Sequence, residues 1–203
     1  NSKTIEEKDV DTSQCFIPKT EEQILAELDN YVGLQSVKDE IRAIIRNVKA
    51  KKENGVKEKL LKDHYLFTGN PGTGKTTFAR KFGEVLNAIG ALPTGQFVEV
   101  AAKDLIGQYI GDSEENVRKY VNQAMGGVLF IDEAYALNQS TGGYGMDAIN
   151  TLLTLLENRK GEFVCVMAGY TKEMGEFVRM NPGIPSRCNV TIEFPDYTAR
   201  ELE

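Results

Sequence analysis

The chain is poor in the residues that build metal sites and disulfide frameworks. It has one histidine, His64, and three cysteines, Cys15, Cys165 and Cys188, among 203 residues. Because the cysteines are odd in number and far apart, neither a disulfide framework nor a zinc site is indicated, and a reducing, cytoplasmic compartment fits best. Cys165 lies inside an apolar run and is predicted to be a small core residue. His64 begins a predicted strand and is interpreted as structural.

Two further absences concern membranes and nucleic acids. No apolar run approaches the ~18 residues that a membrane-spanning helix needs, and the polar start of the chain does not have the pattern of a signal peptide. The net charge is -6, whereas a surface that tracks nucleic-acid phosphates usually shows a basic excess. We therefore expect a globular protein with no membrane partner, and nucleic acid is not an expected partner either.

Short apolar segments and amphipathic segments alternate over residues 64–197. The pattern predicts strands at 64–68, 96–100, 127–132, 162–168 and 190–194, with helices at 75–89, 113–125, 144–158 and 172–180 between them. Continuously apolar strands separated by helices are typical of a parallel sheet covered on both faces. The fold class is therefore α/β, with five parallel strands.

The segment before the first predicted strand is expected to be helical. Thr20 and Gln23 have capping-box spacing, which predicts a short helix after Thr20, and a longer helix is predicted from about Gln35. Residues 21–63 are therefore assigned to N-terminal helices and a linker. Residues 1–20 are polar and without periodicity, and we expect them to be disordered.

The most informative motif is Gly69-Asn70-Pro71-Gly72-Thr73-Gly74-Lys75-Thr76, which fits the phosphate-binding P-loop and lies between a predicted strand and a predicted helix. In this pattern backbone N–H groups cradle the β-phosphate, the lysine ammonium bridges the β and γ oxygens, and the hydroxyl of the last residue ligates Mg²⁺. The motif predicts binding of a nucleoside triphosphate with Mg²⁺, through Pro71, Gly72, Thr73, Gly74, Lys75, Thr76 and Thr77.

A second acidic motif follows the third predicted strand. The apolar run 128–131 ends in Asp132 and Glu133. In P-loop enzymes such an aspartate holds Mg²⁺, and a neighbouring glutamate can orient and polarise the attacking water. The alternative is a strand that runs into an exposed acidic turn, and the P-loop upstream favours the catalytic interpretation. The pair indicates hydrolysis.

Two loops carry less specific signals. Tyr109, Ile110 and Gly111 form an aromatic-aliphatic-glycine tip, which is either functional or a tyrosine packed under its own loop, and Ser113 is predicted to cap the next helix. Arg187 lies in a proline-rich loop before the last strand, where it can serve as an arginine finger for a neighbouring subunit. On its residue type alone, an ordinary surface salt bridge is the favoured role for Arg187.

Taken together, these motifs resemble those of AAA+ ATPases, in particular the group that contains stage V sporulation protein K and CbbX, the red-type Rubisco activase. The resemblance covers about residues 29–197 and rests on Tyr31-Val32-Gly33-Leu34, the P-loop, Gln108-Tyr109-Ile110-Gly111, Leu129 to Tyr135, Ala168-Gly169-Tyr170, Asn181-Pro182-Gly183 with Ser186-Arg187, and Phe194 to Tyr197.

The resemblance implies a hexameric ring that hydrolyses ATP between subunits and pulls a protein substrate through its centre. It implies that Val32 and Gly33 contact adenine and that Tyr109, Ile110 and Gly111 form a pore loop. It further implies that Thr171 is the sensor-1 residue and that Arg187 is the arginine finger. The ATPase core is then 64–197, residues 198–203 are the start of a truncated lid, and the rest of the helical lid is expected beyond residue 203.

A second hypothesis comes from another functional class. A nucleotide-dependent assembly or switch ATPase, associated with secretion or with a scaffold, would use the same site without threading a substrate. A GTPase is disfavoured because residues 171–174 lack the aspartate that reads guanine. After Gly111 the chain has Asp112-Ser113-Glu114 in place of the His-Thr pair common in the CbbX group, which argues against Rubisco activation.

Overall fold

One parallel sheet organises the protein. The computed structural model describes residues 19–31, 33–55, 60, 61 and 63–196. Five strands pair in parallel in the order β2-β3-β4-β1-β5. They are β1 (Tyr65–Gly69), β2 (Phe97–Ala101), β3 (Val128–Asp132), β4 (Val164–Gly169) and β5 (Val190–Phe194). This confirms the predicted α/β class and the five-stranded parallel sheet.

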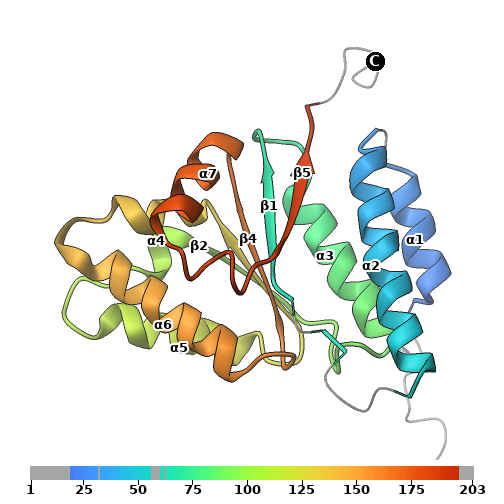
Figure 1. Ribbon diagram of the computed structural model, residues 1–203, viewed down its shortest axis with the longest axis horizontal. Helices are drawn as coiled ribbons and strands as arrows, with labels where there is room; N and C mark the ends of the chain where they lie inside the picture. The colour runs from blue at the N-terminus through green and yellow to red at the C-terminus, as the bar shows by residue number, and fades with distance from the viewer. Residues whose placement is uncertain (1–18, 32, 56–59, 62, 197–203) are drawn as a thin grey trace, which may run out of the picture.

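Helices cover both faces of this sheet (Figure 1). On one face lie α1 (Glu21–Asp29), α2 (Gln35–Glu53) and α3 (Lys75–Ala88). On the other lie α4 (Ala102–Leu105), α5 (Asp112–Gln123), α6 (Tyr144–Asn158) and α7 (Thr171–Met180). The short 3-10 helices η3 (Ala134–Gln139) and η4 (Thr141–Gly143) connect β3 to α6.

The central strands β1, β3 and β4 contribute side chains to both hydrophobic cores because successive residues point to opposite faces. In β1, Tyr65 and Phe67 belong to the core beneath α1, α2 and α3, whereas Leu66 belongs to the core beneath α4 to α7. In β3, Phe130 and Ile131 divide in the same way. This two-sided burial explains why these central strands are almost continuously apolar, whereas the edge strands β2 and β5 carry exposed polar residues.

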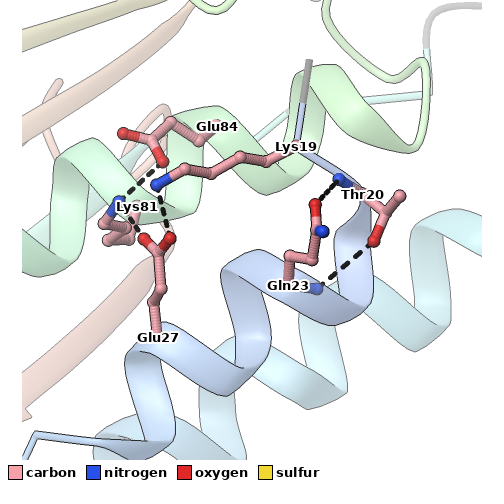
Figure 2. Close-up of polar contacts among 6 residues, drawn as sticks. All are labelled: Lys19, Thr20, Gln23, Glu27, Lys81 and Glu84. Carbon is pink, nitrogen blue, oxygen red and sulfur yellow. Dashed lines mark hydrogen bonds and ion pairs between the residues drawn. The ribbon is translucent and has the colours of Figure 1, made fainter. Parts of the chain in front are cut away.

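The helix α1 is fastened to α3 by ion pairs, as Figure 2 shows. The Lys81 ammonium lies 2.6 Å from a Glu27 carboxylate oxygen and 2.8 Å from Glu84, and Lys19 also pairs with Glu27. The hydrogen bonds from Lys19 and Lys81 hold the pKa of Glu27 well below its ordinary value, at about 2. The helix that begins at the P-loop is therefore braced by a helix from the N-terminal segment.

The expected start of α1 is confirmed in detail. The Thr20 hydroxyl accepts a hydrogen bond from the Gln23 N–H at 3.3 Å, and the Gln23 side chain accepts one from the Thr20 N–H at 2.9 Å (Figure 2). This reciprocal pair is the predicted capping box. The disorder expected for residues 1–20 falls on 1–18, which lie outside the described residues.

One local prediction was wrong. Ser113 does not cap α5, because the capping position is Gly111 and Ser113 lies inside the first turn. Its hydroxyl instead accepts a hydrogen bond from the Gly107 N–H at 2.8 Å. In addition, α4 and η3 had not been predicted. Within the described residues, no helix combines the length and the apolar character needed to cross a bilayer.

His64 is a core residue, as its place at the start of a strand had indicated. It is 1% exposed, its Nδ1 accepts a hydrogen bond from the Cys165 N–H at 3.0 Å, and its Nε2 lies 3.5 Å from the Leu156 carbonyl oxygen. Burial lowers the pKa of His64 from 6.5 to about 4, although the contact with Leu156 opposes this shift. Protonation of Nδ1 would also break the bond from Cys165.

This burial predicts a pH-dependent stability. Between pH 6.5 and about 4 the unfolded chain binds a proton at His64 that the folded protein does not, so stability should fall as the pH is lowered through this window, by at most about 3 kcal/mol. Because the chain has one histidine, its NMR signal can be followed without assignment. We expect the His64 signal to titrate with a midpoint near pH 4 in the folded protein and near pH 6.5 in the urea-unfolded chain. A folded midpoint near 6.5 would contradict the prediction.

Candidate nucleotide-binding and hydrolytic site

A cleft opens at the carboxyl ends of β1, β3 and β4, and its volume is about 390 Å³. It is lined by residues from the P-loop, from the end of β3 and from the end of β4: Pro71, Gly72, Gly74, Lys75, Thr76, Thr77, Asp132, Glu133, Gly169 and Tyr170. Ligands of parallel α/β sheets bind at this edge. The structure therefore brings both predicted motifs into one cleft.

The P-loop backbone depends on glycine at positions where other residues would be strained. Gly72 and Gly74 have φ angles of 76° and 91°. Gly69 has a φ of 151°, and a Cβ atom there would lie 2.5 Å from the Phe194 carbonyl oxygen. The loop then leads into α3, whose first residue is Lys75. The N-terminus of this helix presents free N–H groups and a positive dipole end to an anion.

Lys75 is held inside the loop. Its ammonium donates to the Gly69 carbonyl oxygen at 2.8 Å and to the Asn70 carbonyl oxygen at 2.7 Å. Burial lowers the pKa of Lys75, and the nearby Asp132 carboxylate opposes this shift. The Asn70 side chain donates to both Asp196 carboxylate oxygens, at 2.8 and 2.9 Å, so the loop is also tied to the segment after β5. Sequence reasoning missed this tie.

Asp132 and Glu133 occupy different environments although they are adjacent. Asp132 is half-buried at the end of β3, whereas Glu133 is exposed. An Asp132 carboxylate oxygen accepts the Glu133 N–H at 3.0 Å. Glu133 has a φ of 51°, the left-handed region that non-glycine residues rarely adopt. Such backbone outliers concentrate at functional sites.

The oxygen ligands in the cleft fit Mg²⁺ bound together with phosphates. The cleft offers the Thr76 hydroxyl and the Asp132 carboxylate, and no group of three or more His, Cys, Asp or Glu side chains among the described residues could hold a metal alone. Mg²⁺ is usually bound through one or two protein oxygens plus substrate phosphates and water. A two-ligand site therefore suits Mg²⁺ that arrives with a nucleotide.

The residue after β4 that lines the cleft is Tyr170, not Thr171. Thr171 is exposed as the first residue of α7, and its sensor role stays a prediction. The Tyr170 hydroxyl lies 3.4 Å from a Glu133 carboxylate oxygen. Its position directly after a buried strand was the sequence signal for this residue. Of the two residues expected to contact adenine, Val32 lies outside the described residues and Gly33 is half-buried.

The loop that carries Tyr109 and Ile110 projects from the protein. The two side chains are 73% and 94% exposed, so Tyr109 does not pack under its own loop. The Asp112 carboxylate accepts the Gln108 and Tyr109 N–H groups at 3.3 and 3.0 Å, and Ser113 accepts the Gly107 N–H. The first turn of α5 therefore fixes the loop backbone while its tip stays free.

Arg187 lies near the amino end of β1, whereas the P-loop follows the carboxyl end of the same strand. Its carbonyl oxygen accepts the His64 N–H at 3.3 Å, just before β1 begins. Its guanidinium donates to the Gly183 carbonyl oxygen at 3.1 Å and lies 3.6 Å from a Glu157 carboxylate oxygen. The structure thus shows the salt bridge of the alternative interpretation, and the finger role stays a prediction.

The fold and the cleft define a P-loop nucleotide-binding protein of the α/β class. Residues 65–196 match the ATPase family associated with various cellular activities (AAA), and the chain belongs to this family. This confirms both the resemblance and the ATPase class predicted from the sequence.

The same conclusion follows from curated relatives. The chain is 43% identical to Protein CbbX of Cereibacter sphaeroides over 89% of this chain and 60% of that protein. It is 38% identical to Stage V sporulation protein K of Bacillus subtilis, over 89% of this chain and 57% of that protein. It is 41% identical to the chloroplastic ribulose bisphosphate carboxylase/oxygenase activase of Cyanidioschyzon merolae, over 89% of this chain and 64% of that protein. The chain therefore spans about three-fifths of the length of these relatives.

The position of Glu133 predicts a separation of binding from turnover. Glu133→Gln keeps the size of the side chain but removes its basicity, so ATP affinity should be retained while turnover falls at least ~10²-fold. Phosphate release and ATP binding measured on the same preparations test this. Glu176→Gln, an exposed glutamate of α7 outside the cleft, is the control. Unchanged turnover in Glu133→Gln would remove Glu133 from the reaction.

Proposed function

We propose that the chain is the ATPase part of a protein-remodelling motor that works as a ring. The assembly that the AAA+ resemblance implies is a hexamer. The observation that carries this proposal is the exposed pair Tyr109 and Ile110 on a loop whose backbone is fixed by α5. An exposed aromatic and aliphatic pair is suited to gripping a polypeptide, since it offers apolar contact without reading a particular sequence.

In the hydrolytic site each described side chain has a proposed role. The P-loop N–H groups and Lys75 bind and orient the phosphates, and Thr76 and Asp132 hold Mg²⁺, which supplies charge neutralisation when bound. Glu133 orients the attacking water toward the γ-phosphate and accepts a proton from that water. These are the residues assigned from the sequence, and their arrangement around one cleft supports the assignment.

The place of Arg187 supports a site shared between subunits. The Arg187 backbone pairs with His64 just before β1, and the P-loop follows the other end of this five-residue strand. At about 3.3 Å per residue, the two ends of β1 are about 16 Å apart. Arg187 cannot reach the phosphates of its own subunit across this distance. In a ring, each subunit can present a surface far from its own cleft to the cleft of its neighbour. We therefore propose that Arg187 acts on the phosphate site of the next subunit.

We propose that the substrate is another protein. We also propose that the chain acts in the cytoplasm. Relatives include one whose name describes an activase of ribulose bisphosphate carboxylase/oxygenase, which supports action on another protein. The free, buried thiols of Cys165 and Cys188 fit a reducing compartment. Because Asp112-Ser113-Glu114 after Gly111 departs from the pattern that the resemblance led us to expect, we do not extend Rubisco activation to this chain.

A shared site predicts that turnover depends on assembly. ATP hydrolysis per subunit should rise with protein concentration, and Arg187→Ala and Glu133→Gln should each be nearly inactive alone. Mixing these two variants should restore part of the activity, because an intact Arg187 of one subunit meets an intact Glu133 of its neighbour. Arg46→Ala, an exposed arginine of α2, is the control. A flat concentration profile with no recovery on mixing would contradict a site completed in trans.

The exposed loop predicts a separate effect on substrate work. A carboxymethylated, permanently unfolded protein should stimulate ATP hydrolysis by the wild type. Tyr109→Ala should lose this stimulation while its basal rate is unchanged, because Tyr109 lies outside the cleft, and Tyr109→Phe should keep it. Equal stimulation of wild type and Tyr109→Ala would exclude Tyr109 as the grip. No stimulation of either would favour the assembly or switch ATPase that does not thread substrate.

A further inference from the structure

We propose that Tyr170 is a positioning residue for Glu133, and that Tyr135 in turn fixes Tyr170. The inference rests on the proposed role of Glu133 in hydrolysis but not on ring assembly or on a protein substrate. It concerns the residue directly before Thr171, which the family resemblance placed at the sensor-1 position.

The pairing of the strands puts the two side chains together. β3 and β4 are adjacent and parallel, with Ile131 opposite Met167. The residues that follow the two strands, Glu133 and Tyr170, therefore meet at the same edge of the sheet and line the same cleft. The Tyr170 hydroxyl donates to Glu133 Oε1 at 3.4 Å. Among the described residues it is the hydrogen-bond donor that the structure gives to this carboxylate.

A contact of 3.4 Å is long for a hydrogen bond between oxygens, so its energy alone is not the argument. Catalytic hydrogen bonds are often long until the reacting groups are assembled. The geometry matters because Glu133 is exposed and has freely rotating side-chain bonds. A donor at Oε1 selects one orientation of the carboxylate and leaves Oε2 to accept the proton of the attacking water.

Tyr170 is itself restrained. Its ring lies 5.6 Å from the ring of Tyr135 at an interplanar angle of 36°. Tyr135 can approach because residue 169 is glycine, where a Cβ atom would lie 2.8 Å from both Tyr135 and Met174. Burial, followed by the charge of Glu133, raises the pKa of Tyr135. Glu133, Tyr170 and Tyr135 therefore form one cluster, built on η3 and the end of β4.

Thr171 does not share this geometry. It begins α7 and is exposed, and it is not among the residues that line the cleft. The preceding residue, Tyr170, has an extended backbone with φ of -72° and ψ of 141°, and its side chain reaches the cleft. The hydroxyl that is available to Glu133 from the end of β4 is thus the phenolic one.

The test is a double-mutant cycle on ATP turnover with wild type, Tyr170→Phe, Glu133→Gln and the double variant. Tyr170→Phe removes one hydroxyl and keeps the ring that packs on Tyr135. We expect kcat to fall roughly 10-fold, with ATP affinity unchanged. In the Glu133→Gln background the same substitution should have no further effect, because its target carboxylate is already gone.

Two controls separate positioning from a structural role. Tyr120→Phe removes a hydroxyl from α5, outside the cleft, and should leave kcat unchanged. Thermal unfolding should show nearly equal midpoints for wild type and Tyr170→Phe, because the hydrogen bond that is lost goes to the exposed Glu133 carboxylate.

Three outcomes would overturn the inference. A wild-type kcat in Tyr170→Phe would show that the hydroxyl is not used. Losses that multiply in the double variant would show that Tyr170 acts directly on the nucleotide and not through Glu133. Normal turnover in Glu133→Gln would refute the role of Glu133 and the inference with it. By contrast, failure to form a ring or to respond to unfolded protein would refute only the proposed motor.

Discussion

The parallel pairing of β1, β3 and β4 is the constraint on which the site depends. Parallel strands end at the same edge of a sheet, so the P-loop, the acidic pair and Tyr170 converge although they are separated by about a hundred residues. Two hydrophobic cores, one on each face, hold these strands in register. A shift of one residue in β3 would reverse the directions of Asp132 and Glu133.

The edge opposite the cleft has a different task. Arg187 lies shortly before β5, within reach of Glu157 and the Gly183 carbonyl oxygen. The same sheet therefore separates the phosphate site from its proposed trans-acting cation by the length of a strand. The bracing of α3 by α1 through Lys81 and Glu27 adds support from the N-terminal segment to the helix that begins at the P-loop.

Much of the fold could be predicted because its signals are local. The strand β5 and the helix α6 begin and end at the predicted residues, and the other predicted strands and helices of the sheet differ by one or two residues. α4 was missed because four residues are too few to show a helical period. Ser113 was assigned to a cap because serine before acidic residues is common there, but Gly111 with positive φ takes that position.

The sequence by itself determined that the chain binds a nucleotide, since the P-loop is a continuous motif whose glycines, lysine and threonine act through one turn of backbone. It also determined the acidic pair, because a buried strand that ends in two carboxylates is a local pattern. Only the tertiary structure decided that Tyr170, and not Thr171, faces Glu133, and that Arg187 is paired with Glu157. Those contacts join residues from different strands and loops, and they depend on strand order and side-chain direction, which no local pattern encodes.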